Sequence, residues 1–295
     1  MSKKHPVIAV TGSSGAGTTT VKRAFEHIFF REKINAAVIE GDSFHCLSRM
    51  EFKDAVKKAE AEGNMHFSHF GPQANHFAKL AELFKTYGET GGGKKRYYIH
   101  SDEEAAEHNK RLNTSLNPGE FTPWEDVPAG SDVLFYEGLH GLVKTDDVDV
   151  SQHVDLGIGV VPIVNLEWIQ KIHRDGAERG YSADVIVDTI LRRMPDYVNY
   201  ITPQFSRTDI NFQRVSTVDT SNPFITRDIP TPDESFIVIR FREPKGVDFP
   251  YLLNMIPNSF MSRRNTLVVP GAKMGFAMEL ILAPIIQDMI AGKSK

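Results

Sequence analysis

Short apolar runs alternate with longer stretches of helical periodicity along the chain. The runs at residues 7–10, 36–40, 133–137, 156–161, 236–241 and 267–269 predict buried β-strands. Periodic apolar positions predict helices at residues 19–31 and 275–290, the first directly after a glycine-rich loop and the second closing the chain. This alternation is typical of an α/β domain whose mixed, mostly parallel sheet is flanked by helices.

Three intervening regions have a different, more polar character. Residues 66–93 predict a helix with loops, and residues 113–130, which contain three prolines, predict a connecting segment. Residues 88–96 combine glycines with Lys94, Lys95 and Arg96, which favours a mobile surface loop. No internal repeat or linker is evident, so we expect residues 1–295 to form a single domain with insertions.

Composition narrows the class of protein. The chain has 295 residues, 41% of them hydrophobic and 24% charged, as in ordinary globular proteins. A net charge of −4 argues against nucleic-acid binding through bulk positive charge. Cys46 is the only cysteine and excludes an intrachain disulfide, and neither a signal peptide nor a membrane-spanning apolar run is recognisable. We therefore expect a cytoplasmic protein with no membrane and no nucleic acid among its partners.

A glycine-rich segment between the first strand and the first helix carries the strongest chemical signal. Glycines allow backbone N–H groups to point at phosphate oxygens, and the helix N-terminus adds partial positive charge. A hydroxyl at Thr19 is placed to coordinate magnesium. The candidate ATP-binding residues are Gly12, Ser13, Ser14, Gly15, Ala16, Gly17, Thr18, Thr19 and Thr20.

This segment departs from the usual phosphate-loop pattern at one position. Thr18 occupies the place of the lysine that normally balances charge on the β- and γ-phosphates. A unit charge lost at about 4 Å costs up to about 4 kcal/mol at an effective dielectric constant of about 20. A working kinase therefore needs a cation from another segment. The alternative to a phosphate-binding loop is a glycine-rich turn that binds no ligand.

The strand at residues 133–137 ends in Glu137, as a Walker B strand ends in an acid. Ligands of parallel sheets gather at the carboxyl ends of the strands, where this carboxylate can hold magnesium. The alternative is that Glu137 simply faces solvent at the end of a strand. The glycine-rich loop at Gly12 favours the metal-binding interpretation over this alternative.

A third acid, Asp42, follows the second strand. A carboxylate there is placed to accept the proton of a hydroxyl that attacks the γ-phosphate. An aspartate after glycine also commonly forms an Asx-turn or N-cap, and the local sequence does not separate the two. His45 and Arg49 are four residues apart and would share a face if the chain is helical there.

Residues 165–180 predict a helix with charged side chains along one face. Lys171, Arg174, Asp175 and Glu178 fall at positions i, i+3, i+4 and i+7, as on a solvated, salt-bridged helix face. The missing lysine of the phosphate loop favours a catalytic role for these cations instead. The pair at residues 192–193 adds two arginines suited to forked recognition of phosphate.

Together these motifs resemble the bacterial phosphoribulokinases over residues 6–282. The matching segments are residues 12–20 (GSSGAGTTT), 40–45 (EGDSFH), 135–141 (FYEGLHG), 165–175 (NLEWIQKIHRD) and 218–224 (VDTSNPF). The resemblance implies a P-loop NTPase fold of the nucleotide-kinase type. It also implies ATP- and Mg²⁺-dependent phosphorylation of ribulose 5-phosphate to ribulose 1,5-bisphosphate.

The resemblance further implies roles for individual residues. Asp42 is implied as the catalytic base, and Lys171 and Arg174 as stabilisers of the transferring phosphoryl group. Asp175 and Glu137 are implied as acids at the metal and the reacting phosphate. The residues implied to contact the sugar phosphate are His45, Arg49 and Arg179.

Assembly and regulation are also implied by the resemblance. Members of this branch are homo-oligomers, often activated by NADH and inhibited by AMP. The arginines implied in that regulation are Arg31, Arg240 and Arg263.

Two other functions stay open at this stage. A kinase of another small metabolite, such as a uridine or pantothenate kinase, normally keeps the phosphate-loop lysine and does not need the arginines. A catalytically inactive nucleotide sensor has no need of a base at Asp42. Both features favour the phosphoribulokinase function.

Overall fold

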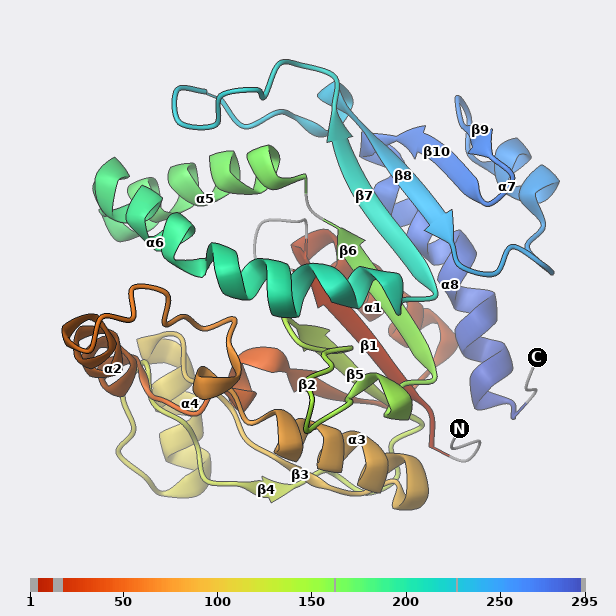
Figure 1. The fold of residues 1–295 in the computed structure, drawn as a ribbon. Helices are drawn as coiled ribbons and strands as arrows, with labels where there is room; N and C mark the ends of the chain where they lie inside the picture. The colour runs from red at the N-terminus through yellow and green to blue at the C-terminus, as the bar shows by residue number, and fades with distance from the viewer. Residues whose placement is uncertain (1–4, 13–17, 162, 227, 293–295) are drawn as a thin grey trace.

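The computed structural model describes residues 5–12, 18–161, 163–226 and 228–292. Its centre is an eight-stranded sheet of order β2-β5-β1-β6-β7-β8-β10-β9 (Figure 1). The strands are β1 (Val7–Gly12), β2 (Ala36–Glu40), β5 (Val133–Gly138), β6 (Leu156–Val161), β7 (Ile210–Ser216), β8 (Ser235–Phe241), β9 (Phe260–Arg263) and β10 (Thr266–Pro270). All six strands predicted from the sequence are present.

Strand direction divides the sheet into two parts. β2, β5, β1, β6 and β7 are mutually parallel, so their carboxyl ends share one edge of the sheet. β8, β10 and β9 continue the sheet in antiparallel pairing. The α/β class with a mixed, mostly parallel sheet is thereby confirmed.

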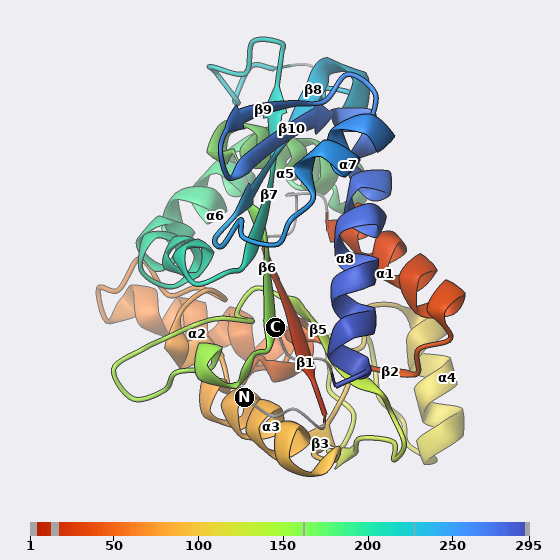
Figure 2. The same cartoon turned by 90° about the vertical axis from the view of Figure 1, so that its right-hand side faces the viewer.

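Helices cover both faces of the sheet (Figure 2). They are α1 (Thr18–Glu32), α2 (Arg49–Ala61), α3 (Phe77–Thr90), α4 (Asp102–Leu112), α5 (Val164–Arg179), α6 (Ala183–Asp196), α7 (Phe249–Met255) and α8 (Met274–Ile290). None of the helices in the described ranges is long and apolar enough to cross a membrane.

The alternation of side chains along β1 builds a core on each face. Ile8 and Val10 pack with α1 and α8, whereas Val7 and Ala9 pack on the opposite face with α3. All four side chains are fully buried. The central strand therefore fixes both layers and carries the glycine-rich loop at its carboxyl end.

The segment 88–96 is not a mobile surface loop, and that prediction is wrong. Gly88 lies in the last turn of α3 and is buried, and Lys95 is buried in β3 (Lys94–Lys95). β3 pairs with β4 (Glu125–Asp126) in a small second sheet. Four glycines and three cations suggested mobility, but tertiary pairing with a distant segment fixes this stretch.

Candidate active site

The site is assembled where the parallel strands end. Gly12 is the last residue of β1, and α1 begins at Thr18, so the glycine-rich loop joins a strand to a helix as predicted. A Cβ on Gly12 would lie 2.8 Å from the carbonyl oxygen of Val160 on β6, which explains the requirement for glycine there.

Several predicted ATP-binding residues lie outside the described structure. These are Ser13, Ser14, Gly15, Ala16 and Gly17. The backbones of Thr18 and Thr19 form the first turn of α1, and Thr20 is exposed. Nucleotide binding by this loop stays a prediction supported by its strand–loop–helix context.

Three carboxylates lie at or just after the carboxyl ends of β2 and β5. Glu40 and Glu137 are paired in register at the ends of β2 and β5, and Asp42 follows two residues after Glu40. Burial raises the pKa of Glu137 to about 7, and the negative charges of Glu40 and Asp42 add to this effect against the opposing charge of Lys22. The excess negative charge at this point suits a bound cation.

Asp42 lies in a short 3₁₀ turn, η1 (Gly41–Phe44), and does not cap a helix. Its carboxylate is 3.4 Å from Nε2 of His45, and its side chain is 46% exposed. Burial raises the pKa of Asp42, but the hydrogen bond and charge of His45 outweigh it and hold the pKa at about 2. Asp42 is therefore ionised and accessible at neutral pH.

His45 and Arg49 do not share a helix face, so that interpretation is wrong. His45 has an extended backbone after η1, and α2 begins only at Arg49, behind an N-cap formed by Ser48. The N–H of Arg49 donates to the carbonyl of Gly119 at 2.8 Å. A distant loop therefore fixes Arg49, and both side chains still line the same cavity.

The charged face of α5 is an ion-pair network rather than a solvated surface. Nζ of Lys171 donates to the carboxylate of Asp175, whose other oxygen accepts from Nε of Arg174 at 3.1 Å. The side chains of Lys171 and Asp175 are 10% and 4% exposed. Burial, with the nearby charge of Arg193, lowers the pKa of Lys171 to about 8 despite its contact with Asp175.

A cavity of about 670 Å³ is lined by Asp42 and by some of the charged side chains described above, but Glu137 and Asp175 are not among its lining residues. It contains four predicted site residues besides Asp42: His45, Arg49, Lys171 and Arg174. Five lysine and arginine side chains line it, against two carboxylates. This balance favours an anionic ligand. Arg179 ends α5, but its side chain is outside the described part of the chain.

Other cavity residues were missed in the sequence. They are Lys53, His69, Tyr98, His100, Glu167 and Trp168 among others. Lys53 lies four residues after Arg49 on α2, a helical spacing that places both on one face. The remainder come from segments that only the fold brings together, so no local pattern indicated them.

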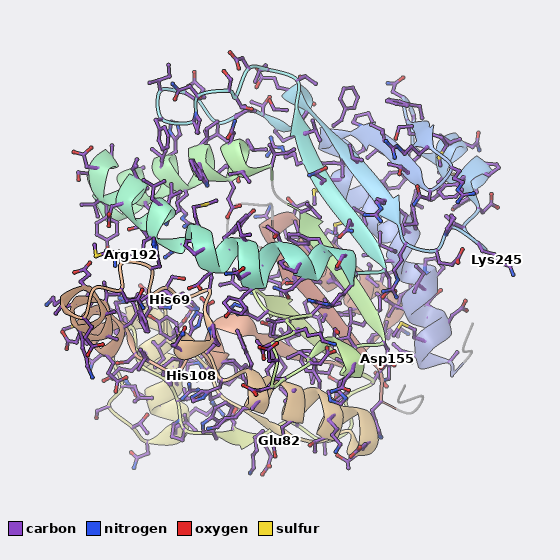
Figure 3. The ribbon with its side chains drawn as sticks, viewed as in Figure 1. His69, Glu82, His108, Asp155, Arg192 and Lys245 are labelled. Carbon is purple, nitrogen blue, oxygen red and sulfur yellow. The ribbon has the colours of Figure 1, made fainter. Side chains whose placement is uncertain are left out.

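The two adjacent arginines on α6 have separate roles. Arg193 lines the cavity with its guanidinium 5.2 Å from the ring centre of Phe70. Arg192 donates instead to Glu60 at 2.5 Å and to Asp188 at 3.3 Å. The prediction that Arg192 takes part in phosphate recognition is therefore wrong: its ion pair with Glu60 joins α6 to α2. Figure 3 labels Arg192 and His69.

Arg96 supports the turn that carries Asp42. Its Nε donates to the carbonyl of Ser43 at 2.8 Å and its Nη2 to that of His45 at 2.5 Å. The guanidinium also lies 3.7 Å from the ring centre of Phe121. Burial lowers its pKa to about 10, so it remains charged at neutral pH.

The predicted regulatory arginines lie away from this cavity. Arg240 on β8 and Arg263 on β9 are both paired in register with Thr266 of β10, one on each side, and both are exposed. Arg31 lies in the last turn of α1 and contacts Glu32 and Glu279, the latter on α8. Two of the three arginines are therefore neighbours across β10.

Comparison with known proteins agrees with this arrangement. The family model described as "Phosphoribulokinase / Uridine kinase family" matches residues 7–221. This chain belongs to that family. The proteins named phosphoribulokinase from Nitrobacter vulgaris and chromosomal phosphoribulokinase from Cupriavidus necator are each 60% identical to it over 295 residues, covering 100% of this chain and at least 99% of theirs.

A solved structure of this family has the same fold. The phosphoribulokinase from Rhodobacter spheroides is 52% identical, with a TM-score of 0.89 and 99% of both chains covered. The family resemblance drawn from the motifs and the P-loop kinase fold are thereby confirmed. The chain is a kinase of this family, so ATP and Mg²⁺ are its expected cosubstrate and cofactor.

Proposed function

We propose that the protein transfers the γ-phosphoryl group of ATP to a hydroxyl of ribulose 5-phosphate, forming ribulose 1,5-bisphosphate. One observation carries the proposal most directly: Asp42 faces a cavity lined by five lysine and arginine side chains. A substrate that already bears a phosphate needs this positive charge, whereas an uncharged nucleoside does not. The full-length relatives named phosphoribulokinase support the same acceptor.

Asp42 is proposed as the base that accepts the proton of the attacking hydroxyl. Its carboxylate is ionised and partly exposed, as this role requires. Lys171 and Arg174 face the same cavity and neutralise charge on the transferring phosphoryl group. Phosphoryl transfer depends mainly on positioning and charge, so these cations replace the lysine that is absent at Thr18.

The sugar phosphate is proposed to contact His45, Arg49 and Arg179. His45 and Arg49 are separated by the turn after η1, and both line the cavity. Arg193 and Lys53 add positive charge to the lining. An arginine donates two parallel hydrogen bonds to a phosphate, which fixes the orientation of the substrate as well as its affinity.

Among the described residues no group of three or more His, Cys, Asp or Glu side chains is arranged to hold a metal ion, so a Mg²⁺ ion would be bound together with the phosphates of ATP. Thr19, Glu137 and Asp175 are the proposed residues for holding it, and Glu137 has the raised pKa that a bound cation would reverse. A bound Mg²⁺ neutralises charge on the β- and γ-phosphates of ATP. Asp175 is paired with Lys171 and Arg174, so it also fixes the cations of α5.

Regulation and assembly are proposed from the same family resemblance. Arg31, Arg240 and Arg263 are proposed to mediate activation by NADH and inhibition by AMP in a cytoplasmic homo-oligomer. The pairing of Arg240 and Arg263 around Thr266 supports a shared anion-binding role for these two.

A coupled assay of ADP release tests the proposed reaction. Ribulose 5-phosphate, other pentose phosphates, uridine and pantothenate are offered as acceptors with ATP and Mg²⁺, with and without NADH or AMP. Turnover that depends on ribulose 5-phosphate is the expected result. Turnover with another acceptor alone would overturn the substrate, and no turnover with any acceptor would favour a nucleotide sensor.

A further inference from the structure

His45 makes a second, buried contact on the side of its ring away from Asp42. Its Nδ1 lies 2.7 Å from Oδ1 of Asn75, and both residues are 7% exposed. Asn75 follows a short 3₁₀ turn, η2 (Pro72–Ala74), about thirty positions along the chain. A β-bridge joins the two residues, so backbone and side chain are both held in place.

The orientation of the Asn75 amide follows from its other partners. Its Nδ2 donates to the carbonyls of His69 at 2.8 Å and Gly71 at 2.7 Å. The reversed amide would place Oδ1 against two carbonyl oxygens and lose both hydrogen bonds. Oδ1 therefore faces His45, and an amide oxygen only accepts hydrogen bonds.

This geometry determines which nitrogen of His45 serves Asp42. Nδ1 of His45 must carry a proton, because its partner is an acceptor. Nε2 then faces the Asp42 carboxylate across 3.4 Å, and it donates to that carboxylate when the ring carries a second proton and is cationic. Rotation of the ring by half a turn about its side-chain bond would break both contacts.

We propose that Asn75 is a positioning residue for phosphoryl transfer: it holds the His45 ring so that Nε2 orients the Asp42 carboxylate toward the acceptor hydroxyl. The inference rests on the proposed role of Asp42 as base. Asn75 is not among the residues that line the cavity, so it acts through His45 and not on the substrate.

Kinetics of Asn75→Ala test this inference. We expect kcat to fall about 10- to 100-fold while KM for ATP changes less than about twofold. When Asn75→Ala is added to His45→Asn, we expect a further loss of kcat of less than about twofold, because the His45 ring that Asn75 positions is already absent. Equal losses in both backgrounds, or an unchanged kcat, would overturn the inference.

Two further variants separate positioning from folding stability. Asn75→Asp keeps the acceptor for Nδ1 but loses the donors to His69 and Gly71, so we expect a lower Tm with a smaller loss of kcat than in Asn75→Ala. A loss of kcat in Asn75→Asp as large as in Asn75→Ala would assign Asn75 a purely structural role.

Asn211→Ala is the matched control. Asn211 is 9% exposed, and its side chain donates to Phe205 and accepts from Thr208. We expect its Tm to fall with kcat unchanged; an equal loss of kcat would attribute the Asn75 effect to stability. The wild-type rate with ribulose 5-phosphate is measured first. No wild-type turnover with it would overturn the proposed function, and the variant series would then follow whichever acceptor is active.

Discussion

Glu40 and Glu137 occupy paired positions at the carboxyl ends of β2 and β5. Two carboxylates at adjacent strand ends, with Asp42 nearby, repel one another unless one is protonated or a cation binds. The pKa of Glu137 is raised to about 7, chiefly by burial and then by these neighbours. The proposed metal site is therefore coupled to proton release near neutral pH.

Glu137→Gln should weaken binding of Mg²⁺·ATP and remove its dependence on pH. In the wild type we expect affinity to rise as pH increases through about 7, because Glu137 then ionises. Calorimetric titration with Mg²⁺·ATP across this range measures both effects. Glu40→Gln is the companion variant: removing its charge should move the transition to lower pH. An unchanged pH dependence in Glu137→Gln would exclude Glu137 as its source.

Lys171→Met should lower kcat about 100- to 1,000-fold, since a buried cation that faces the transferring group is lost. Lys57→Met, at a side chain 78% exposed on α2, is the control and should leave kcat unchanged.

In the wild type, kcat/KM for ATP reports on the free enzyme. It should fall above about pH 8, where Lys171 loses its proton. An alkaline limb that persists in Lys171→Met would belong to another group.

Arg49→Ala should raise KM for the sugar phosphate about 10- to 100-fold, with a small effect on KM for ATP, because hydrogen bonds to charged groups contribute about 1.5–3 kcal/mol. Steady-state kinetics with each substrate varied in turn measure this split. Arg111→Ala is the control, since Arg111 on α4 pairs with Glu125 and does not line the cavity. An equal rise in both KM values would argue against a specific sugar-phosphate contact.

His140 should make the protein less stable in mild acid. It is 4% exposed, and burial lowers its pKa to about 3, from the ordinary value of 6.5. The unfolded chain takes up this proton below about pH 6.5, while the folded chain does not until about pH 3. The free energy of unfolding should therefore decrease as pH falls through this window, by up to about 1.4 kcal/mol per pH unit for this group.

His140→Gln tests that origin. Glutamine keeps a donor for the carbonyl of Phe70, which accepts from Nε2 of His140 at 3.0 Å, but does not titrate. The free energy of unfolding, measured with urea at several pH values, should depend less steeply on pH, by the contribution of about one proton. A slope unaffected by His140→Gln would assign the acid sensitivity to other groups, such as His69.

Strong local patterns predicted β1, β2, β5 and β6 of the parallel part of the sheet, and β8 and β10 of the antiparallel part. β2 and β6 have the predicted bounds, because continuous apolar runs bounded by turn residues leave little choice of structure. β7 was missed, because four of the seven residues in its sequence, INFQRVS, are polar. Its place between a parallel and an antiparallel neighbour is a tertiary property that the local sequence does not show. α4 was missed for a similar reason, since its sequence is mostly charged.

The site was predictable in part for the same physical reasons. Asp42, Lys171 and Arg174 follow strands or lie on one helix face, so local spacing indicated them. Asn75, Arg96 and His100 act on the site from segments far away in the chain. Their local sequence carries no chemical motif, and only the packing of the fold brings them to Asp42 and His45.

The most direct test of the proposed function compares wild type with Asp42→Asn in ribulose 5-phosphate-dependent ADP release. The amide keeps the shape of the side chain but cannot accept the proton. Wild-type turnover with a loss of kcat of about 100- to 10,000-fold in the variant, at unchanged affinity for ATP, is the expected result. Near-normal turnover of Asp42→Asn, or no wild-type turnover with ribulose 5-phosphate, would contradict it.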